Sequence, residues 1–493
     1  MQTASLIFLT KIKMKKTRVN KFPRTFWVAN TMELIERWAW YGFYMVFALY
    51  LTKSTETGAL GFTQAQKGLI MGIGTAFLYA LPLITGAIAD KIGYKKVLII
   101  AFTIYSSAFL LLGVVTEFVP VFLSYLYLAI GAALFKPVIS ATIAKTTNEK
   151  NSSIGFGIFY MMVNFGAFIG PLFTSKLRAH SWLLVFVMSA VVIAVNFILV
   201  LFFYKEPDRE KSDEKFIETI KKSFSNVLTT LKDFKFLVFL ILIIGFWTMY
   251  NQLFYTLPVF IDQWIDTSVL YEKIYQIWPW LAENIGTEQH IIEAEMLTNI
   301  DAMYIIIFQI AISALVMKLK PLNAMISGIF IASFGIGLSF ATNNPFYILI
   351  TIFVFAIGEM SSSPKITEYI GRIAPKDKIA LYMGASFLPV AGGNFFAGIL
   401  SGNVYGSMSD KINILRTELL SLNYKFPDFS ASFTKSDLFN KGCEIMHKTP
   451  VELNNYLWDK YNPSQIWVVF ASIGIGTAIL LFIFDRVFMK TKK

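Results

Sequence analysis

Long apolar runs recur along the chain and alternate with shorter polar segments. The runs 181–204 and 461–484 contain no charged residue at all. Because a bilayer core about 30 Å thick requires a helix of about 20 apolar residues, these runs predict membrane spans. We expect an all-α integral membrane fold with twelve transmembrane helices in two sets of six. The predicted helices are 26–51, 66–89, 97–116, 118–144, 152–173, 181–204, 236–261, 298–317, 322–342, 346–371, 379–402 and 463–486.

The polar segments between these runs predict the domain organisation. We expect a basic cytoplasmic tail, two six-helix bundles, a cytoplasmic linker and two extramembrane loops. Their predicted ranges are 1–25 for the tail, 26–204 and 236–489 for the bundles, 205–235 for the linker, and 263–297 and 403–462 for the loops. In the linker, apolar residues from Phe216 to Leu231 recur at helical spacing, which favours an amphipathic helix on the membrane surface. A solvated linker explains the same pattern equally well.

Composition supports a membrane protein and excludes a disordered chain. Apolar residues make up 55% of the sequence and charged residues 15%, and mean hydropathy is +0.57. With the N-terminus inside, 30 of the 44 Lys and Arg residues fall in inner segments, so the positive-inside rule puts both termini in the cytoplasm. The net charge of +12 is then explained by a cell membrane location, without a nucleic-acid partner.

Cysteine and histidine content excludes several chemical classes. The single Cys443 cannot form a disulfide framework or a cysteine-based metal site within the chain. The three histidines share no metal-ligand spacing and lie outside the predicted spans. We therefore expect neither an intramembrane enzyme nor a bound cofactor.

The first predicted helix carries three charged residues, which are costly inside a membrane and mark a functional site. Glu33, Glu36 and Arg37 lie on one face of this helix, which continues through Tyr41 and Tyr44. Two acids against one base leave an excess negative charge when all three are ionised. One of the two glutamates is therefore a candidate site of reversible protonation. An ion pair that only stabilises the helix is the alternative.

Two further charges stand nearly alone in apolar runs. Lys136 lies in the fourth predicted helix, just before Pro137, and Glu359 lies in the tenth, five residues before Pro364. A buried lysine requires a carboxylate, and a buried glutamate requires a base or a proton. The pair therefore predicts a Lys136–Glu359 bridge that locks the two halves together on one side. Alternatively, either side chain reaches water near an interface.

Six motifs spread over about 340 residues together resemble the proton-dependent oligopeptide transporter (POT/PTR) family of the major facilitator superfamily. In the first helix, Glu33 to Gly42 resembles the ExxERFxYYG motif. The loop after the second helix contributes Gly86–Lys96, and the fourth helix contributes Phe135–Pro137. Further matches are Phe159–Gly166 (FYxxxNxG) in the fifth helix, Phe246–Gln252 in the seventh and Glu359–Pro364 (ExxxSP) in the tenth.

The resemblance implies proton-coupled symport of di- and tripeptides by a protein that we expect to be monomeric, with the proton as coupling ion. It implies proton coupling by Glu33, Glu36 and Arg37, and a contact of Lys136 with the peptide carboxylate. Glu359, Asn164 and Asn299 would bind the amino end of the peptide. Tyr41, Tyr44 and Tyr79 would line the site, while Asp90, Lys136 and Glu359 would act in gating.

Two departures from the family pattern concern the substrate. Members commonly carry an arginine at the position of Tyr44 and an acid at that of Asn251, and both charges are absent here. The loss removes one anchor for a peptide carboxylate. The alternative substrate is therefore another small anion or a drug-like molecule, including one that is exported.

Overall fold

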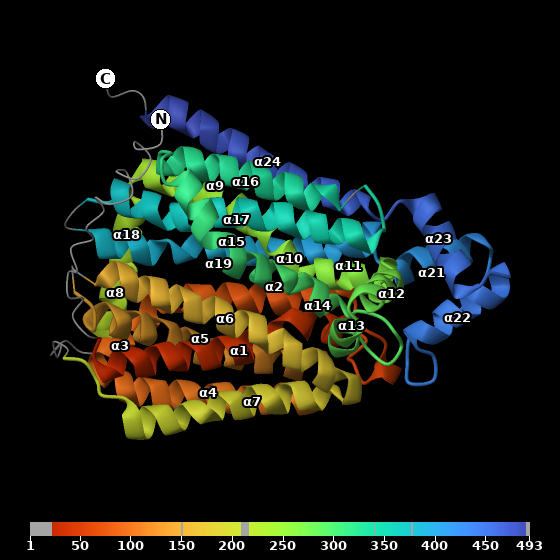
Figure 1. Ribbon diagram of the computed structural model, residues 1–493, viewed down its shortest axis with the longest axis horizontal. Coiled ribbons are helices and arrows are strands. Elements are labelled where there is room, and N and C mark those ends of the chain that lie inside the picture. The colour runs from red at the N-terminus through yellow and green to blue at the C-terminus, as the bar shows by residue number, and fades with distance from the viewer. Residues whose placement is uncertain (1–21, 149–150, 209–215, 340, 376–377, 490–493) are drawn as a thin grey trace, which may run out of the picture.

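The computed structural model describes residues 22–148, 151–208, 216–339, 341–375 and 378–489. Within these residues the molecule is built from helices, and its β-pairing is limited to two isolated bridges. The basic tail expected over 1–25 lies largely outside them. The helices form two layers, with α1–α7 in one and α9–α11, α14–α19 and α24 in the other (Figure 1).

The first half comprises seven helices that lie next to one another in the bundle. They are α1 (Arg24–Thr52), α2 (Gln64–Ala80), α3 (Pro82–Ile92), α4 (Tyr94–Val114), α5 (Phe118–Lys145), α6 (Ser152–His180) and α7 (Trp182–Ile198). Helices α2 and α3 meet at an angle of 45°. The sequence predicts one helix over 66–89, but Pro82 lacks the N–H that a continuous helix needs and breaks it.

The bundle of the second half is built from eleven described helical segments, several of which continue one another. They are α9 (Phe234–Tyr250), α10 (Gln252–Tyr255), α11 (Leu257–Trp264), α14 (Ala294–Thr298), α15 (Ile300–Val316), α16 (Pro321–Leu338), α17 (Pro345–Ile373), α18 (Ile379–Ala385), α19 (Phe387–Ile399), α20 (Tyr405–Met408) and α24 (Gln465–Phe484). A π-helix, Leu400–Val404, connects α19 to α20. Helices α9 and α10 together, and α14 and α15 together, are long enough to span a membrane.

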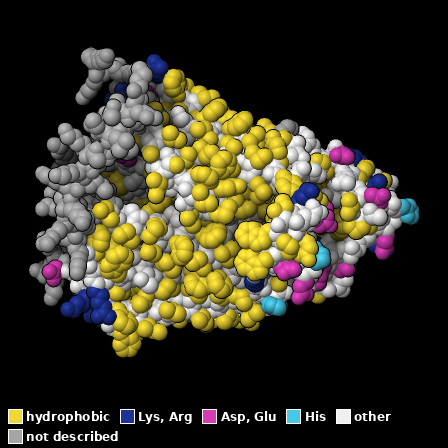
Figure 2. Space-filling view, viewed as in Figure 1, with side chains coloured by type: hydrophobic (Ala, Val, Ile, Leu, Met, Phe, Trp, Pro, Cys, Tyr) yellow, Lys and Arg dark blue, Asp and Glu magenta, His cyan; other side chains and the backbone are white. Residues whose placement is uncertain are grey.

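Ten helices of the described chain are long and apolar enough to cross a membrane, or eleven if the bent α2–α3 pair is one span. The remaining predicted span, 26–51, corresponds to α1. It is not among these helices because its charges and tyrosines make it less apolar. Its 29 residues nevertheless correspond to about 43 Å of helix, and most of its side chains are buried among those of the first half. Exposed apolar side chains cover the broad middle of the molecule, as expected for contact with lipid (Figure 2).

The two ends of the bundle differ. Helix α1 begins and α24 ends at one end, which we call the tail end (Figure 1). At the opposite end, the cap end, short helices project beyond the bundle: α12 (Ser268–Ile277), α13 (Pro279–Ile285), α21 (Lys411–Ser421), α22 (Lys435–Met446) and α23 (Pro450–Tyr461).

The segment between the halves contains α8 (Phe216–Leu231), which lies at the tail end against α3 and α18. Residues 209–215, which precede it, lie outside the described residues. Helix α8 contacts one helix of each half, so it connects them at the tail end in addition to its covalent link.

Candidate functional site

The three charged residues of α1 form one buried cluster. The Arg37 guanidinium donates to both carboxylate oxygens of Glu36, at 2.5 and 2.7 Å, and its Nε lies 3.3 Å from Oε1 of Glu33. Tyr105 of α4 donates a further hydrogen bond of 2.6 Å to Glu36. Glu36 therefore has three donors, whereas Glu33 has one longer contact. Of the two carboxylates, Glu33 is the less firmly held in its charged form.

Two glycines of α6 allow α1 to approach closely at this cluster. A Cβ on Gly166 would lie 2.4 Å from the Leu34 carbonyl oxygen and 2.7 Å from Cβ of Arg37. A Cβ on Gly170 would lie 2.5 Å from the backbone nitrogen of Gly42. Since backbone atoms cannot move aside, any larger residue at these positions would separate the two helices and disturb the placement of Arg37.

Lys136 of α5 belongs to the same half and faces the α1 cluster. Its ammonium group lies 4.7 Å from the centre of the Tyr79 ring, a cation–π distance. It is also close enough to Glu33 to attract that carboxylate. Lys136 and Tyr79 are both half-buried, and Tyr79 lies next to the break between α2 and α3, so a solute that enters the bundle can reach them.

The second half contains a buried carboxylate pair, of which the sequence indicated only one member. Glu359 of α17 accepts a hydrogen bond of 2.9 Å from the Tyr250 hydroxyl of α9. Asp301 of α15 lies against the Glu359 carboxylate, and the two residues are 5% and 8% exposed. Asp301 is the fourth residue of the predicted span 298–317, so counting charges inside the spans could have identified it. Two carboxylates in contact can share a proton, because ionising both is unfavourable.

The expected Lys136–Glu359 bridge is not formed in this conformation. Both are described residues, and no ion pair joins them. Lys136 is directed to Tyr79 and Glu33 within the first half, and Glu359 to Tyr250 and Asp301 within the second. Each residue contacts groups of its own half, so a bridge would require the halves to rearrange at the level of α5 and α17.

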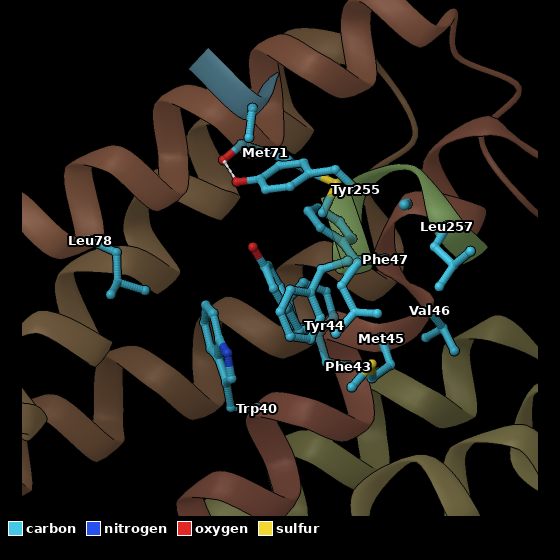
Figure 3. Packing of buried hydrophobic residues seen from close by; sticks show 14 of the residues in the cluster. Trp40, Phe43, Tyr44, Met45, Val46, Phe47, Met71, Leu78, Tyr255 and Leu257 are labelled. Atoms are coloured by element: carbon cyan, nitrogen blue, oxygen red, sulfur yellow. Dashed lines mark hydrogen bonds between the residues drawn. The ribbon is translucent and has the colours of Figure 1, made fainter. Parts of the chain in front are cut away.

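The remaining expected lining residues fall into two groups. Tyr41 lies near Arg37, Tyr79 and Glu359, and therefore joins the charged groups of both halves. Tyr44 stacks on Trp40 at 5.1 Å between ring centres, and its buried hydroxyl points into the space bordered by Leu78 and Tyr255 without a hydrogen-bond partner (Figure 3).

The two expected asparagines and Asp90 each form a hydrogen bond away from the charged groups. Asn164 donates to the Tyr160 carbonyl of its own helix, and is half-buried. Asn299 donates to the Phe168 carbonyl of α6 at 2.9 Å. This hydrogen bond connects the two halves. Asp90 lies near the tail end, where it accepts a hydrogen bond of 2.8 Å from the Tyr94 hydroxyl.

Contacts between the halves close the cap end. Lys53 of the first half pairs with Asp262 at 2.6 Å, and Arg178 pairs with both Glu293 and Glu295. None of these residues was a candidate from the sequence. Tyr44 and Asn251, where the sequence lacks charges, form no ion pair among the described residues. Tyr44 instead packs against the Phe254 ring of the second half, at 5.5 Å between ring centres, and Asn251 donates to the Trp247 carbonyl. The ion pairs that close this end therefore lie farther toward the cap than Tyr44 and Asn251 do.

Comparisons with known proteins agree with this architecture. Residues 31–398 match the model of the Major Facilitator Superfamily. The chain is 27% identical over 190 residues to dipeptide and tripeptide permease A of Erwinia pyrifoliae, a match that covers 38% of each chain. It is 26% identical over 377 residues to a Na⁺, Li⁺, K⁺/H⁺ antiporter of Planococcus maritimus, covering 72% of this chain and 84% of the relative. The permease match thus spans well under half of that relative's length.

The fold is also similar to solved structures. A crystal structure of a POT family transporter in complex with a thioalcohol-conjugated peptide superposes with a TM-score of 0.69 over 94% of this chain and 96% of the other, at 16% identity. At this identity the likeness concerns the fold, and the chemistry of the site depends on the residues described above.

Proposed function

Because the chain belongs to the Major Facilitator Superfamily and is a multi-pass secondary transporter, not an enzyme, we propose that it couples the inward movement of protons to symport of di- and tripeptides. The Glu33–Arg37–Glu36 cluster carries this proposal. It has one carboxylate more than its arginine can neutralise, and it is buried. A proton on Glu33 leaves Arg37 paired with Glu36 alone and removes the excess charge.

The two halves offer complementary charges to a short peptide. In the first half, Lys136 has a cation–π contact with Tyr79 and suits the peptide carboxylate. In the second half, the Glu359–Asp301 pair includes an Oε2 atom of Glu359 that lacks a hydrogen-bond partner. This pair suits the peptide ammonium group, because a cation in contact with both carboxylates would stabilise their ionised form. A dipeptide bound between them would bridge the halves where no ion pair now joins them.

Transport then requires the cap end to open and close. We place the termini on the cytoplasmic side of the cell membrane, so the cap end faces outward and the present conformation is closed to the outside. A proton that enters with the substrate gains about 2.3 kcal/mol per 100 mV of membrane potential. That energy is available to break the ion pairs of Lys53 and Arg178 in each cycle.

Uptake of a labelled dipeptide into proteoliposomes tests the proposal. An inward proton gradient should drive accumulation, and a protonophore should abolish it. As a matched control, Asp459→Asn on exposed α23 should transport as the wild type does. Absence of uptake above empty liposomes would reject a peptide substrate.

A Lys136→Gln variant tests the proposed orientation of the peptide. It should bind dipeptide more weakly, by about tenfold for one lost charge-assisted hydrogen bond. It should bind the C-terminal amide of the same dipeptide as the wild type does, since that ligand has no carboxylate. Equal losses for both ligands would contradict the assignment of Lys136.

A second candidate function is transport of a different small anion or a drug-like molecule. The uncharged Tyr44 and Asn251 favour it, because they remove one anchor for a peptide carboxylate. The similarity over 72% of the chain to a cation/proton antiporter supports a non-peptide substrate that is exported in exchange for protons, without indicating an anion. Thermal-shift measurements with peptides and with unrelated anions separate the two functions. Stabilisation by non-peptide ligands alone would favour this candidate.

A further inference from the structure

Two cavities meet near the cap end, on the side of the bundle where α6 of the first half faces α12–α15 of the second. Each has a volume of about 590 Å³. One is an apolar groove, with walls that include Phe168, Phe173, Leu281, Ile300 and Met303. The other is a polar cavity, with walls that include Lys53, Arg178, His180, Glu283 and Glu288.

The two cavities are adjacent. Five residues line both of them: Leu172, Lys176, Asn284, Ile285 and Met296. The polarity changes where the spans end, because the candidate span of α6 finishes at His180 and that of α14–α15 begins at Ala294. The apolar groove therefore reaches farther along the spans than the polar cavity does, and α13, which lies outside the spans, lines both. In Figure 2 the hydrophobic surface likewise gives way to charged side chains toward the cap end.

Lys176 stands at the junction, where its side chain is exposed and has no ion pair with any described residue. The partly buried cations nearby are paired, Lys53 with Asp262 and Arg178 with Glu293 and Glu295. Among the described residues, the hydrogen-bond partner of the Lys176 ammonium is the amide oxygen of Asn284, at 3.4 Å. An ammonium group at the mouth of an apolar groove fits an anionic phosphate whose attached chains enter that groove.

The acids of the polar cavity indicate the rest of the headgroup. Glu283 and Glu288 are exposed and line the cavity beyond Lys176. We propose that this cleft binds one phospholipid with an amine-bearing headgroup, such as phosphatidylethanolamine. Its phosphate contacts Lys176, its ammonium group faces Glu283 and Glu288, and an acyl chain fills the apolar groove.

The position of the cleft gives the lipid a conformational role. Its walls belong to different halves, with Phe168 and Leu172 on one side and Leu297 and Ile300 on the other. The groove therefore exists only while the halves meet at the cap end. A bound lipid stabilises the closed cap end, whatever substrate the central site takes.

Native mass spectrometry of the purified full-length protein tests the proposal without using transport. The probes are phosphatidylethanolamine, phosphatidylglycerol and diacylglycerol of equal chain length. Wild type should retain phosphatidylethanolamine best and diacylglycerol least. Lys176→Gln should weaken binding of both phospholipids by about tenfold and leave diacylglycerol unchanged.

The matched control is Lys273→Gln. Lys273 is an exposed lysine of α12 that also contacts an amide oxygen, that of Gln276 at 3.3 Å, and lines neither cavity. The Lys273→Gln variant should bind all three lipids as the wild type does. Equal retention by wild type and Lys176→Gln, or equal losses in both lysine variants, would overturn the site.

Two further variants test the headgroup and the groove separately. Glu283→Gln with Glu288→Gln should reduce retention of phosphatidylethanolamine and not of phosphatidylglycerol. Leu172→Trp, which fills the junction of the cavities, should reduce retention of all three lipids. Phosphatidylglycerol bound as tightly as phosphatidylethanolamine by wild type would refute the amine-bearing headgroup.

Discussion

Lys67 of α2 donates a hydrogen bond of 2.9 Å to the backbone carbonyl of Tyr255, which ends α10 in the opposite half. The Tyr255 hydroxyl in turn donates to the Met71 carbonyl of α2 at 3.0 Å (Figure 3). Lys67 and Met71 are one helical turn apart, so a single tyrosine of the second half is held at two points along α2. This contact, between fully buried residues, is a central element of the closed cap end.

Lys67→Met should open the cap end more often, because the Tyr255 carbonyl would lose its charged donor. This carbonyl also accepts a longer hydrogen bond of 3.4 Å from Ser401. In a Ser401→Cys background the carbonyl therefore loses both donors, and an unsatisfied buried group of this kind costs about 1–3 kcal/mol. The measurement is the maleimide-labelling rate of a Ser401→Cys reporter, which is fully buried beside Tyr255, in a Cys443→Ser background. Labelling should accelerate at least several-fold. Lys53→Met, which removes the more exposed pair with Asp262, is the control and should change the rate less.

Gly398→Ala should also weaken cap-end closure, since α2 and α19 approach through glycines. A Cβ on Gly398 would lie 2.4 Å from the Gly68 carbonyl oxygen and 2.5 Å from Cα of Gly72. Thermal unfolding should show a lower melting temperature and the same reporter a faster reaction. Gly476→Ala is the matched control, because nothing lies within 4 Å of its Cβ position. It should be neutral or stabilising by about 0.5–1 kcal/mol from helix propensity. Equal melting temperatures in the two variants would contradict the close crossing.

Glu33→Gln should uncouple transport without unfolding the protein. Glu36 still neutralises Arg37 in this variant, so substrate exchange should continue. Gradient-driven accumulation should be lost, which for one proton at 100 mV corresponds to roughly 50-fold. Counterflow and gradient-driven uptake in proteoliposomes measure the two activities.

Glu36→Gln should behave differently, because it breaks the tighter of the two ion pairs. Removing one partner of a buried pair costs about 3–5 kcal/mol. The melting temperature should therefore fall well below that of Glu33→Gln. If the two variants were equally stable and equally uncoupled, the distinction drawn between the two carboxylates would not hold.

Asp301→Asn should raise stability at pH 8 and leave it nearly unchanged at pH 5. At high pH the contact between Asp301 and Glu359 brings two carboxylates together with no basic partner, a repulsion that asparagine removes. At low pH the wild-type pair holds its proton, so the advantage disappears. Thermal unfolding across this pH range measures the difference, with the exposed Asp459→Asn as control. A constant difference across pH would show that the pair does not bind a proton.

Glu418→Gln in the cap should destabilise the cap at neutral pH and do so less as the solution is acidified. Burial opposes ionisation of Glu418, but hydrogen bonds from Lys460, Tyr461 and Tyr456 outweigh it and lower the pKa of this carboxyl. Its ionised form therefore stabilises the cap above the unfolded-state pKa of about 4.3, and this contribution is lost as pH falls through the lowered folded-state pKa. Hydrogen exchange of α21 and α23 should show faster opening in the variant at pH 7, and the difference from the wild type should shrink as pH falls below about 4.3.

The sequence by itself determined the fold class and the residues of the α1 cluster. Apolar runs of membrane length specify spans because a bilayer offers no partner for exposed backbone groups. Glu33, Glu36 and Arg37 are within one helical turn, so their meeting follows from helix geometry. Lys136 and Glu359 were identifiable because each is a charged residue inside an apolar run, where a charge is energetically unfavourable.

Only the tertiary structure decided which of these groups meet across helices. The sequence predicts a Lys136–Glu359 bridge, yet each residue finds a partner in its own half, and Glu359 lies against an aspartate 58 residues earlier in the chain. The cap-end pairs of Lys53 and Arg178 join segments that no periodicity relates. Helical spacing fixes contacts between residues three or four positions apart, whereas contacts between helices depend on how two rigid halves pack in one conformation of several.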